Sequence, residues 1–105
     1  MADITVQELK QRMDTGETLN IIDVREPDEY QAANIGATLV PLSSLTDLHV
    51  FEPFRNSELI VHCRSGARSG RVVQMLKQAG FINPRNLIGG MLAWAAEIDP
   101  SMQVD

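Results

Sequence analysis

The sequence has little cysteine: Cys63 is the only one among 105 residues. A single cysteine cannot form an internal disulfide, which fits a reducing compartment, and there is no second thiol to resolve a covalent intermediate. No apolar stretch approaches the roughly 20 residues that a membrane span needs. The first residues also lack the charged-then-apolar pattern of a signal peptide. We therefore expect a cytoplasmic protein that has no membrane partner.

Acidic residues are absent from one long segment, although the chain as a whole is acidic. The 14 Asp and Glu outnumber the 9 Lys and Arg, which argues against a nucleic acid or an anionic membrane as partner. No carboxylate occurs from Leu59 to Ala96, and this segment holds Arg64, Arg68, Arg71, Lys77 and Arg85. We expect a small anion to be drawn to it. Lys77 and Arg85 are interpreted as part of a solvated helix face.

The length and hydrophobic pattern indicate one α/β domain over residues 1–105. A capping box at Thr5–Glu8 predicts a helix to about Met13. A second helix is expected to start at Pro27, a third to end at Gly80, and a fourth to run from Met91 to Ile98. Strands are expected at Leu19–Val24, Thr38–Val40, from Leu59 and at Asn86–Ile88. Ser43 or Ser44 is expected to cap a helical turn. Such alternation predicts a parallel sheet with helices on both faces.

Cys63 stands at the end of an apolar strand, in a Gly/Ser loop that precedes a helix. In open α/β sheets ligands bind beyond the carboxyl ends of the strands, where helix N-termini favour anions. Neighbouring Arg64 and Arg68 can lower a thiol pKa from about 8.5 into the range of about 3.5–7.5. Gly66 lets the loop turn tightly, so that backbone amides point inward. We predict a reactive thiolate in an anion site; the alternative is a buried structural cysteine.

Several motifs, in this order along the chain, resemble those of the rhodanese-like domains. They are Ile21–Glu26 with Glu29-Tyr30, Cys63–Ser69, Gly80-Phe81, Leu87–Gly90 and Ala93-Trp94. The resemblance implies a five-stranded, mainly parallel sheet and a cysteine that carries sulfane sulfur as a persulfide. On this match the catalytic residue is Cys63, and the substrate-binding loop consists of Arg64, Ser65, Gly66, Ala67, Arg68 and Ser69. We expect no cofactor and no metal ion.

The expected activity is that of a sulfurtransferase. Cys63 would take sulfur from a small anionic donor such as thiosulfate and pass it to cyanide, a small thiol, thioredoxin or a sulfur-carrier protein. The short loops and acidic surface are compatible with a monomer. One alternative is a sulfur-relay or regulatory binding module with little turnover of small donors.

A cysteine phosphatase or an arsenate reductase is the competing enzyme class. The phosphatase motif is Cys-x5-Arg, whereas four residues separate Cys63 from Arg68 in this chain. A loop that is one residue shorter should hold a smaller group than a phosphate with three equatorial oxygens. The spacing therefore favours sulfur.

Three residues near the motifs are expected to support the loop. His62 should face away from Cys63 because strand side chains alternate, so it is interpreted as a packing or hydrogen-bonding residue. Asp23 and Arg25 are expected to form a buried pair that fixes the loops.

Two stretches depart from the family pattern. Ala33-Asn34-Ile35-Gly36 is one residue short and lacks the usual His and Pro, which leaves the path before the third strand open. Pro84 replaces an apolar residue and is expected only to stiffen the lead into the last strand.

Overall fold

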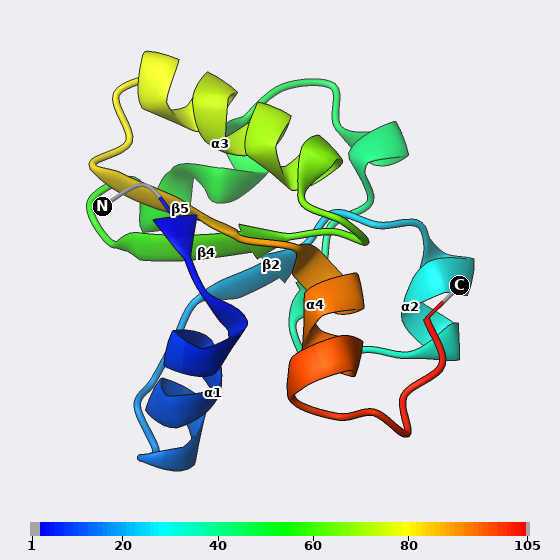
Figure 1. Ribbon diagram of the computed structural model, residues 1–105. Coiled ribbons are helices and arrows are strands. Elements are labelled where there is room, and N and C mark those ends of the chain that lie inside the picture. The colour runs from blue at the N-terminus through cyan, green and yellow to red at the C-terminus, as the bar shows by residue number, and fades with distance from the viewer. Residues whose placement is uncertain (1–2, 105) are drawn as a thin grey trace.

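The computed structural model describes residues 3–104 as an α/β fold built on one sheet (Figure 1). The sheet has five strands in the order β1-β5-β4-β2-β3, and every strand pairing is parallel. The strands are β1 (Asp3–Ile4), β2 (Ile21–Asp23), β3 (Thr38–Leu39), β4 (Glu58–His62) and β5 (Asn83–Leu87). The helices are α1 (Val6–Asp14), α2 (Pro27–Ala32), α3 (Ala67–Gln78) and α4 (Gly90–Glu97), with 3-10 turns η1 (Leu42–Ser44) and η2 (His49–Phe54). The predicted fold class is confirmed.

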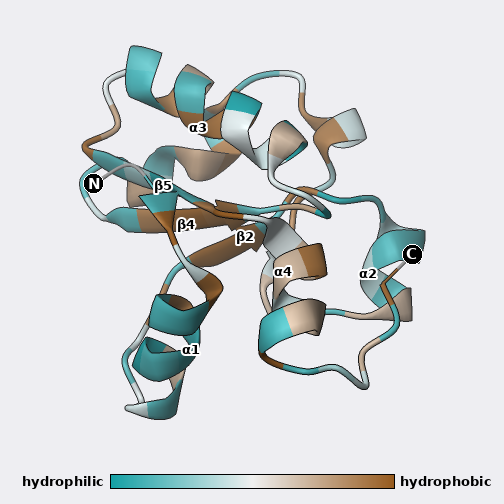
Figure 2. Cartoon of the chain, viewed as in Figure 1, coloured by the Kyte–Doolittle hydropathy of each residue, from teal (hydrophilic) through white to brown (hydrophobic). Residues whose placement is uncertain are grey.

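Helices cover both faces of the sheet, α3 on one and α1 with α4 on the other (Figure 1). Alternating side chains of β4 supply both cores: Leu59 and Val61 pack in the cluster that includes α3, whereas Ile60 packs in the cluster that includes α1 and α4. Figure 2 shows β4 as an almost continuous hydrophobic strand at the centre of the molecule. A strand buried on both faces is typical of a parallel sheet.

Local signals in the sequence predict the starts of α1 and α2 correctly. Thr5 caps α1 by accepting a hydrogen bond from the Glu8 amide, as the capping box predicts. A second capping box joins Glu26 and Glu29 at the start of α2, where Pro27 occupies the first helical position. Capping satisfies backbone amides that have no partner within the helix.

The shortened stretch after α2 forms an ordered turn. The Asn34 side chain accepts a hydrogen bond from the Gly36 amide at 2.9 Å, and Gly36 has a φ of +81°. The Tyr30 hydroxyl donates to the Ala37 carbonyl at 2.8 Å. These contacts order the segment that leads the chain into β3.

Strand β1 and the position of Pro84 were not predicted. Two residues are too short for a periodic pattern, so nothing in the sequence marks Asp3–Ile4 as a strand. Pro84 lies inside β5, opposite Leu59 of β4. Within residues 3–104, β1 pairs with β5 only at Asn86 and Leu87, so Pro84 occupies a part of β5 with a neighbour on one side. A proline without its N–H is tolerated there.

Two further predictions were wrong. Ser43 and Ser44 lie within η1 and do not cap it; Ser43 instead donates a hydrogen bond to Glu26 at 2.6 Å. Arg85 is not on a helix face: it lies in β5, is 9% exposed, and contacts Glu58 at 2.8 Å.

Within residues 3–104, no helix has both the length and the apolar character needed to cross a membrane.

Candidate active site

Cys63 directly follows β4, and the loop that it opens leads into α3. The loop turns at Gly66, which has a φ of +105° and precedes the first residue of α3. Residues with a side chain rarely adopt this conformation, so glycine is suited to the position. The turn places the backbone amides of the first turn of α3 next to the cysteine sulfur.

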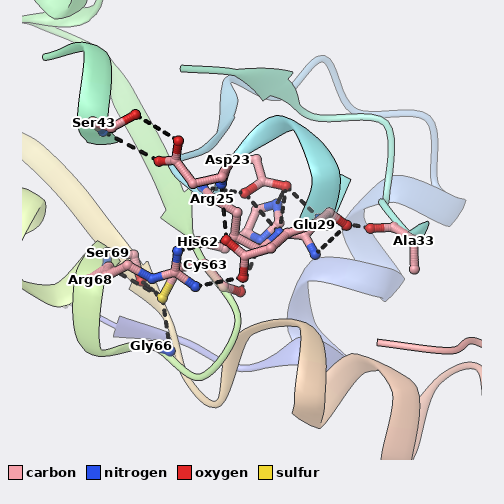
Figure 3. A network of polar contacts seen from close by, with 11 residues as sticks. Asp23, Arg25, Glu29, Ala33, Ser43, His62, Cys63, Gly66, Arg68 and Ser69 are labelled. Carbon is pink, nitrogen blue, oxygen red and sulfur yellow. Dashed lines mark hydrogen bonds and ion pairs between the residues drawn. The ribbon is translucent and has the colours of Figure 1, made fainter. Parts of the chain in front are cut away.

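Hydrogen-bond donors of Gly66 and Ser69 converge on Cys63 Sγ (Figure 3). The Gly66 amide lies 3.1 Å from the sulfur, the Ser69 amide 3.4 Å and the Ser69 hydroxyl 3.3 Å. Both Cys63 and Ser69 are buried. Donors arranged in this way stabilise a sulfur that carries negative charge.

The pKa of the Cys63 thiol lies below its ordinary value. Burial raises this pKa, but the hydrogen bonds from the Ser69 hydroxyl and from the amides of Ser69, Gly66 and Ser65 outweigh burial. The shift has the direction predicted from the sequence, but the groups that outweigh burial are Ser69 and the loop amides, whereas the sequence pointed to Arg64 and Arg68.

Backbone hydrogen bonds from the start of α4 hold the cysteine loop in place. The amides of Met91 and Leu92 donate to the carbonyls of Cys63 and Arg64, each at 3.0 Å. Gly90 makes this approach possible, because a Cβ atom there would lie 2.5 Å from the Cys63 carbonyl oxygen and 2.8 Å from that of Arg64. Gly90 thus allows the start of α4 to hold the cysteine loop through these two backbone hydrogen bonds.

The two loop arginines differ in their surroundings. Arg64 is exposed, as are Ser65 and Ala67. Arg68 is partly buried and forms two hydrogen bonds with the Glu29 carboxylate of α2, at 2.7 and 2.8 Å. This contact lowers the pKa of Glu29 to about 2 and raises that of Arg68. Glu29 offsets part of the positive charge beside Cys63.

Behind the loop, Asp23 and Arg25 form a fully buried ion pair with an N–O distance of 2.7 Å. Arg25 also donates to the carbonyls of Glu29 and Ala33, so the pair joins β2 to both ends of α2 (Figure 3). Buried charges persist only when they are paired and hydrogen-bonded in this way.

His62 is fully buried, and its Nε2 lies 3.7 Å from an Asp23 carboxylate oxygen. Burial lowers the pKa of His62 even though Asp23 opposes this effect, which favours the neutral imidazole. The Nδ1 atom of its ring lies 3.5 Å from the Cys63 carbonyl oxygen, and the ring is not among the donors around Cys63 Sγ, as strand alternation predicts.

Three residues of this site were not predicted to contact the cysteine loop or its side chains. Asn86 accepts a hydrogen bond from the Ser69 hydroxyl at 2.6 Å; the sequence marked it only as a strand residue. Glu29 and Gly90 belong to the motifs that resemble the family, but nothing in the sequence indicated their contacts with Arg68 and with the Cys63 carbonyl. Only the approach of distant segments reveals these roles.

The chain is similar to several known proteins. A model of the rhodanese-like domain family matches residues 5–97. Adenylyltransferase and sulfurtransferase MOCS3-2 of Zea mays is 37% identical over 110 residues, which cover 98% of this chain and 23% of that protein. A protein named Sulfurtransferase from Allochromatium vinosum is 32% identical, with 89% of this chain and 87% of that protein covered. The crystal structure of a rhodanese-like domain protein from Staphylococcus aureus superposes with a TM-score of 0.79 at 32% identity, covering 100% of this chain and 99% of the other.

The chain belongs to the rhodanese-like domain family, a class that includes sulfurtransferases. It spans about a quarter of the length of the Zea mays relative and most of the length of the Allochromatium one.

Proposed function

We propose that the protein is a sulfurtransferase that moves sulfane sulfur from a small anionic donor such as thiosulfate to a thiophilic acceptor. The observation that carries this proposal is the convergence of the Gly66 amide, the Ser69 amide and the Ser69 hydroxyl on Cys63 Sγ at 3.1–3.4 Å. Those donors stabilise a thiolate, which is the nucleophilic form of cysteine. The family relationship supports sulfur as the group that the thiolate attacks.

In the first step the Cys63 thiolate attacks the outer sulfur of thiosulfate. A sulfur–sulfur bond forms to Cys63, the sulfur–sulfur bond of thiosulfate breaks, and its electron pair leaves with sulfite. The product is a Cys63 persulfide anion, and no oxidant or reductant is consumed. Exposed Arg64 and partly buried Arg68 supply positive charge for the dianionic donor and for departing sulfite.

In the second step an acceptor attacks the outer sulfur of the persulfide. With cyanide, a carbon–sulfur bond forms, the sulfur–sulfur bond of the persulfide breaks, and its electron pair restores the Cys63 thiolate as thiocyanate leaves. A small thiol, a thioredoxin-like protein or a sulfur carrier would react at the same atom. Because the enzyme alternates between two covalent states, ping-pong kinetics are expected.

The loop is poorly suited to phosphate chemistry. Four residues separate Cys63 from Arg68, and the Arg68 guanidinium is engaged by both oxygens of Glu29. A phosphatase needs the paired N–H donors of its arginine guanidinium to bind the equatorial oxygens of the transferred phosphoryl group. Both features favour a donor that presents a single sulfur atom.

A second candidate function is sulfur relay between proteins with little turnover of small donors. The observation that favours it is that this chain corresponds to only 23% of a relative whose name joins adenylyltransferase and sulfurtransferase activities. In that case the Cys63 persulfide would receive its sulfur from one protein and give it to another.

Steady-state formation of thiocyanate from thiosulfate and cyanide tests the proposal. The expected result is ping-pong turnover that is lost in Cys63→Ser and an absence of product from an aryl phosphate. Persulfide formation without turnover would favour the relay function. Full activity in Cys63→Ser would contradict the mechanism.

A further inference from the structure

The Ser69 hydroxyl lies between two hydrogen-bond acceptors. Its oxygen is 3.3 Å from Cys63 Sγ and 2.6 Å from Asn86 Oδ1. Ser69 is fully buried, so the protein and not bulk water sets the direction of its O–H. A serine hydroxyl carries one proton and can donate to only one of the two acceptors at a time.

The orientation of the Asn86 amide follows from its other contact. Asn86 Nδ2 lies 3.1 Å from the Gly66 carbonyl oxygen, which can only accept a hydrogen bond. The NH₂ group must therefore face Gly66, and Oδ1 must face Ser69. Since Oδ1 has no proton, Ser69 is the donor in the 2.6 Å contact. Gly70 leaves room for this arrangement, because a Cβ there would lie 3.3 Å from Asn86 Nδ2.

We propose that Asn86 is a positioning residue that competes with the Cys63 sulfur for the single hydroxyl proton of Ser69. While Cys63 is a thiol, its S–H can donate to Ser69 Oγ, and Ser69 donates onward to Asn86. When the thiol proton leaves to solvent, the Ser69 O–H turns to the sulfur and Asn86 Oδ1 loses its donor. The hydroxyl proton stays on Ser69 in both states.

This competition gives Asn86 control over how easily the thiolate forms. Breaking the 2.6 Å contact with Asn86 offsets part of what the thiolate gains from Ser69. Asn86 is not one of the charged or titratable groups around the sulfur. Those groups are Arg64 and Arg68 on the loop and α3, Glu29 on α2, and His62, Asp23 and Arg25 behind β4. Asn86 is uncharged, so its substitution by leucine changes none of these charges.

The test measures ionisation of the thiol by the rate of iodoacetamide alkylation as a function of pH, on the full chain. Asn86→Leu removes the competitor, so we expect an acid dissociation constant of Cys63 about three to ten times larger. Ser69→Ala removes the donor and should make this constant smaller by a similar factor. In the Ser69→Ala background, Asn86→Leu should have no further effect. Asn86→Ala replaces Asn86→Leu if circular dichroism shows that the latter does not fold.

The double variant separates competition from a merely structural role. If Asn86 only held the Gly66 carbonyl, its substitution would change the constant equally with and without the Ser69 hydroxyl, and that result would overturn the proposal. An unchanged or smaller constant in Asn86→Leu alone would also overturn it. The inference rests on Cys63 being the reactive thiol of the proposed function, but alkylation needs no sulfur donor. Failure to accept sulfur from thiosulfate would therefore count against the function and not against the role of Asn86.

Discussion

Arg68 and Glu29 are joined by two hydrogen bonds of 2.7 and 2.8 Å, although 39 residues separate them in the chain. The pair ties the first turn of α3 to α2 and lies beside Cys63 (Figure 3). It orients the guanidinium, and at the same time it offsets the positive charge that the loop offers to an anion. If the proposed function holds, Glu29 should therefore weaken the attraction between the site and an anionic donor.

Glu29→Gln should strengthen the binding of thiosulfate. The variant keeps the shape of the side chain but removes its negative charge. The positive charge of Arg68 is then no longer offset and attracts the anionic donor more strongly. We expect the KM for thiosulfate to fall about two- to fivefold, in line with the strength of partly exposed charge pairs. Glu52→Gln is the matched control, because Glu52 forms a similar pair with Arg55 outside the site. An unchanged or higher KM in Glu29→Gln would show that the pair serves the loop geometry alone.

Gly90→Ala should lower both the stability of the fold and the reactivity of the Cys63 thiol. The new Cβ would meet the carbonyl oxygens of Cys63 and Arg64 at 2.5 and 2.8 Å, so the cysteine loop has to move. We expect a loss of about 2–4 kcal/mol in the free energy of unfolding, measured by urea denaturation, and at least a roughly tenfold slower alkylation of Cys63.

Gly16→Ala is the control for this experiment. Gly16 also has a positive φ, of +81°, but nothing lies within 4 Å of the position that an added methyl group would take. The substitution should cost only about 1 kcal/mol of backbone strain and leave alkylation unchanged. Equal effects of the two substitutions would mean that the contact between Gly90 and the loop has no special role.

Glu58 should stabilise the fold in a pH-dependent way, far from Cys63. It pairs with Arg12 at 2.6 Å and with Arg85 at 2.8 Å, and these contacts lower its pKa from 4.5 to about 2. A carboxylate with a lowered pKa in the folded state stabilises the fold above its unfolded pKa and loses this effect as the pH falls toward 2. Glu58→Gln should therefore cost about 1–2 kcal/mol at pH 7, and the difference from the wild type should shrink between pH 4.5 and pH 2.

The measurement for Glu58 is the urea midpoint across that pH range. Glu17→Gln is a suitable comparison, because Glu17 contacts Arg12 from a more exposed position and should contribute less than about 0.5 kcal/mol. A difference between wild type and Glu58→Gln that stayed constant with pH would contradict this account.

The features predicted well from the sequence are those that local patterns determine. The capping residue Thr5, the start of α2 at Pro27 and the buried strand that ends beside Cys63 all depend on neighbouring residues. The order of the motifs then identified the family, and with it the five-stranded sheet.

The features that were missed depend on contacts between distant segments. Arg85 carries the charge typical of an exposed residue, yet it lies against Glu58 because β5 follows α3 into the sheet. Pro84 breaks a strand pattern, and only the short reach of β1 explains why it is tolerated. The partners of Arg68 and Ser69, Glu29 and Asn86, lie 39 and 17 residues away. No spacing rule connects positions so far apart.

Whether Cys63 carries sulfur is tested by the intact mass of the protein after incubation with thiosulfate and removal of excess donor. We expect wild-type protein to gain one sulfur atom and to lose it on addition of cyanide, whereas Cys63→Ser should gain none. Wild-type protein that gains no sulfur while Cys63 is reduced, or Cys63→Ser that gains it equally, would contradict the assignment of Cys63 as the residue that carries sulfur.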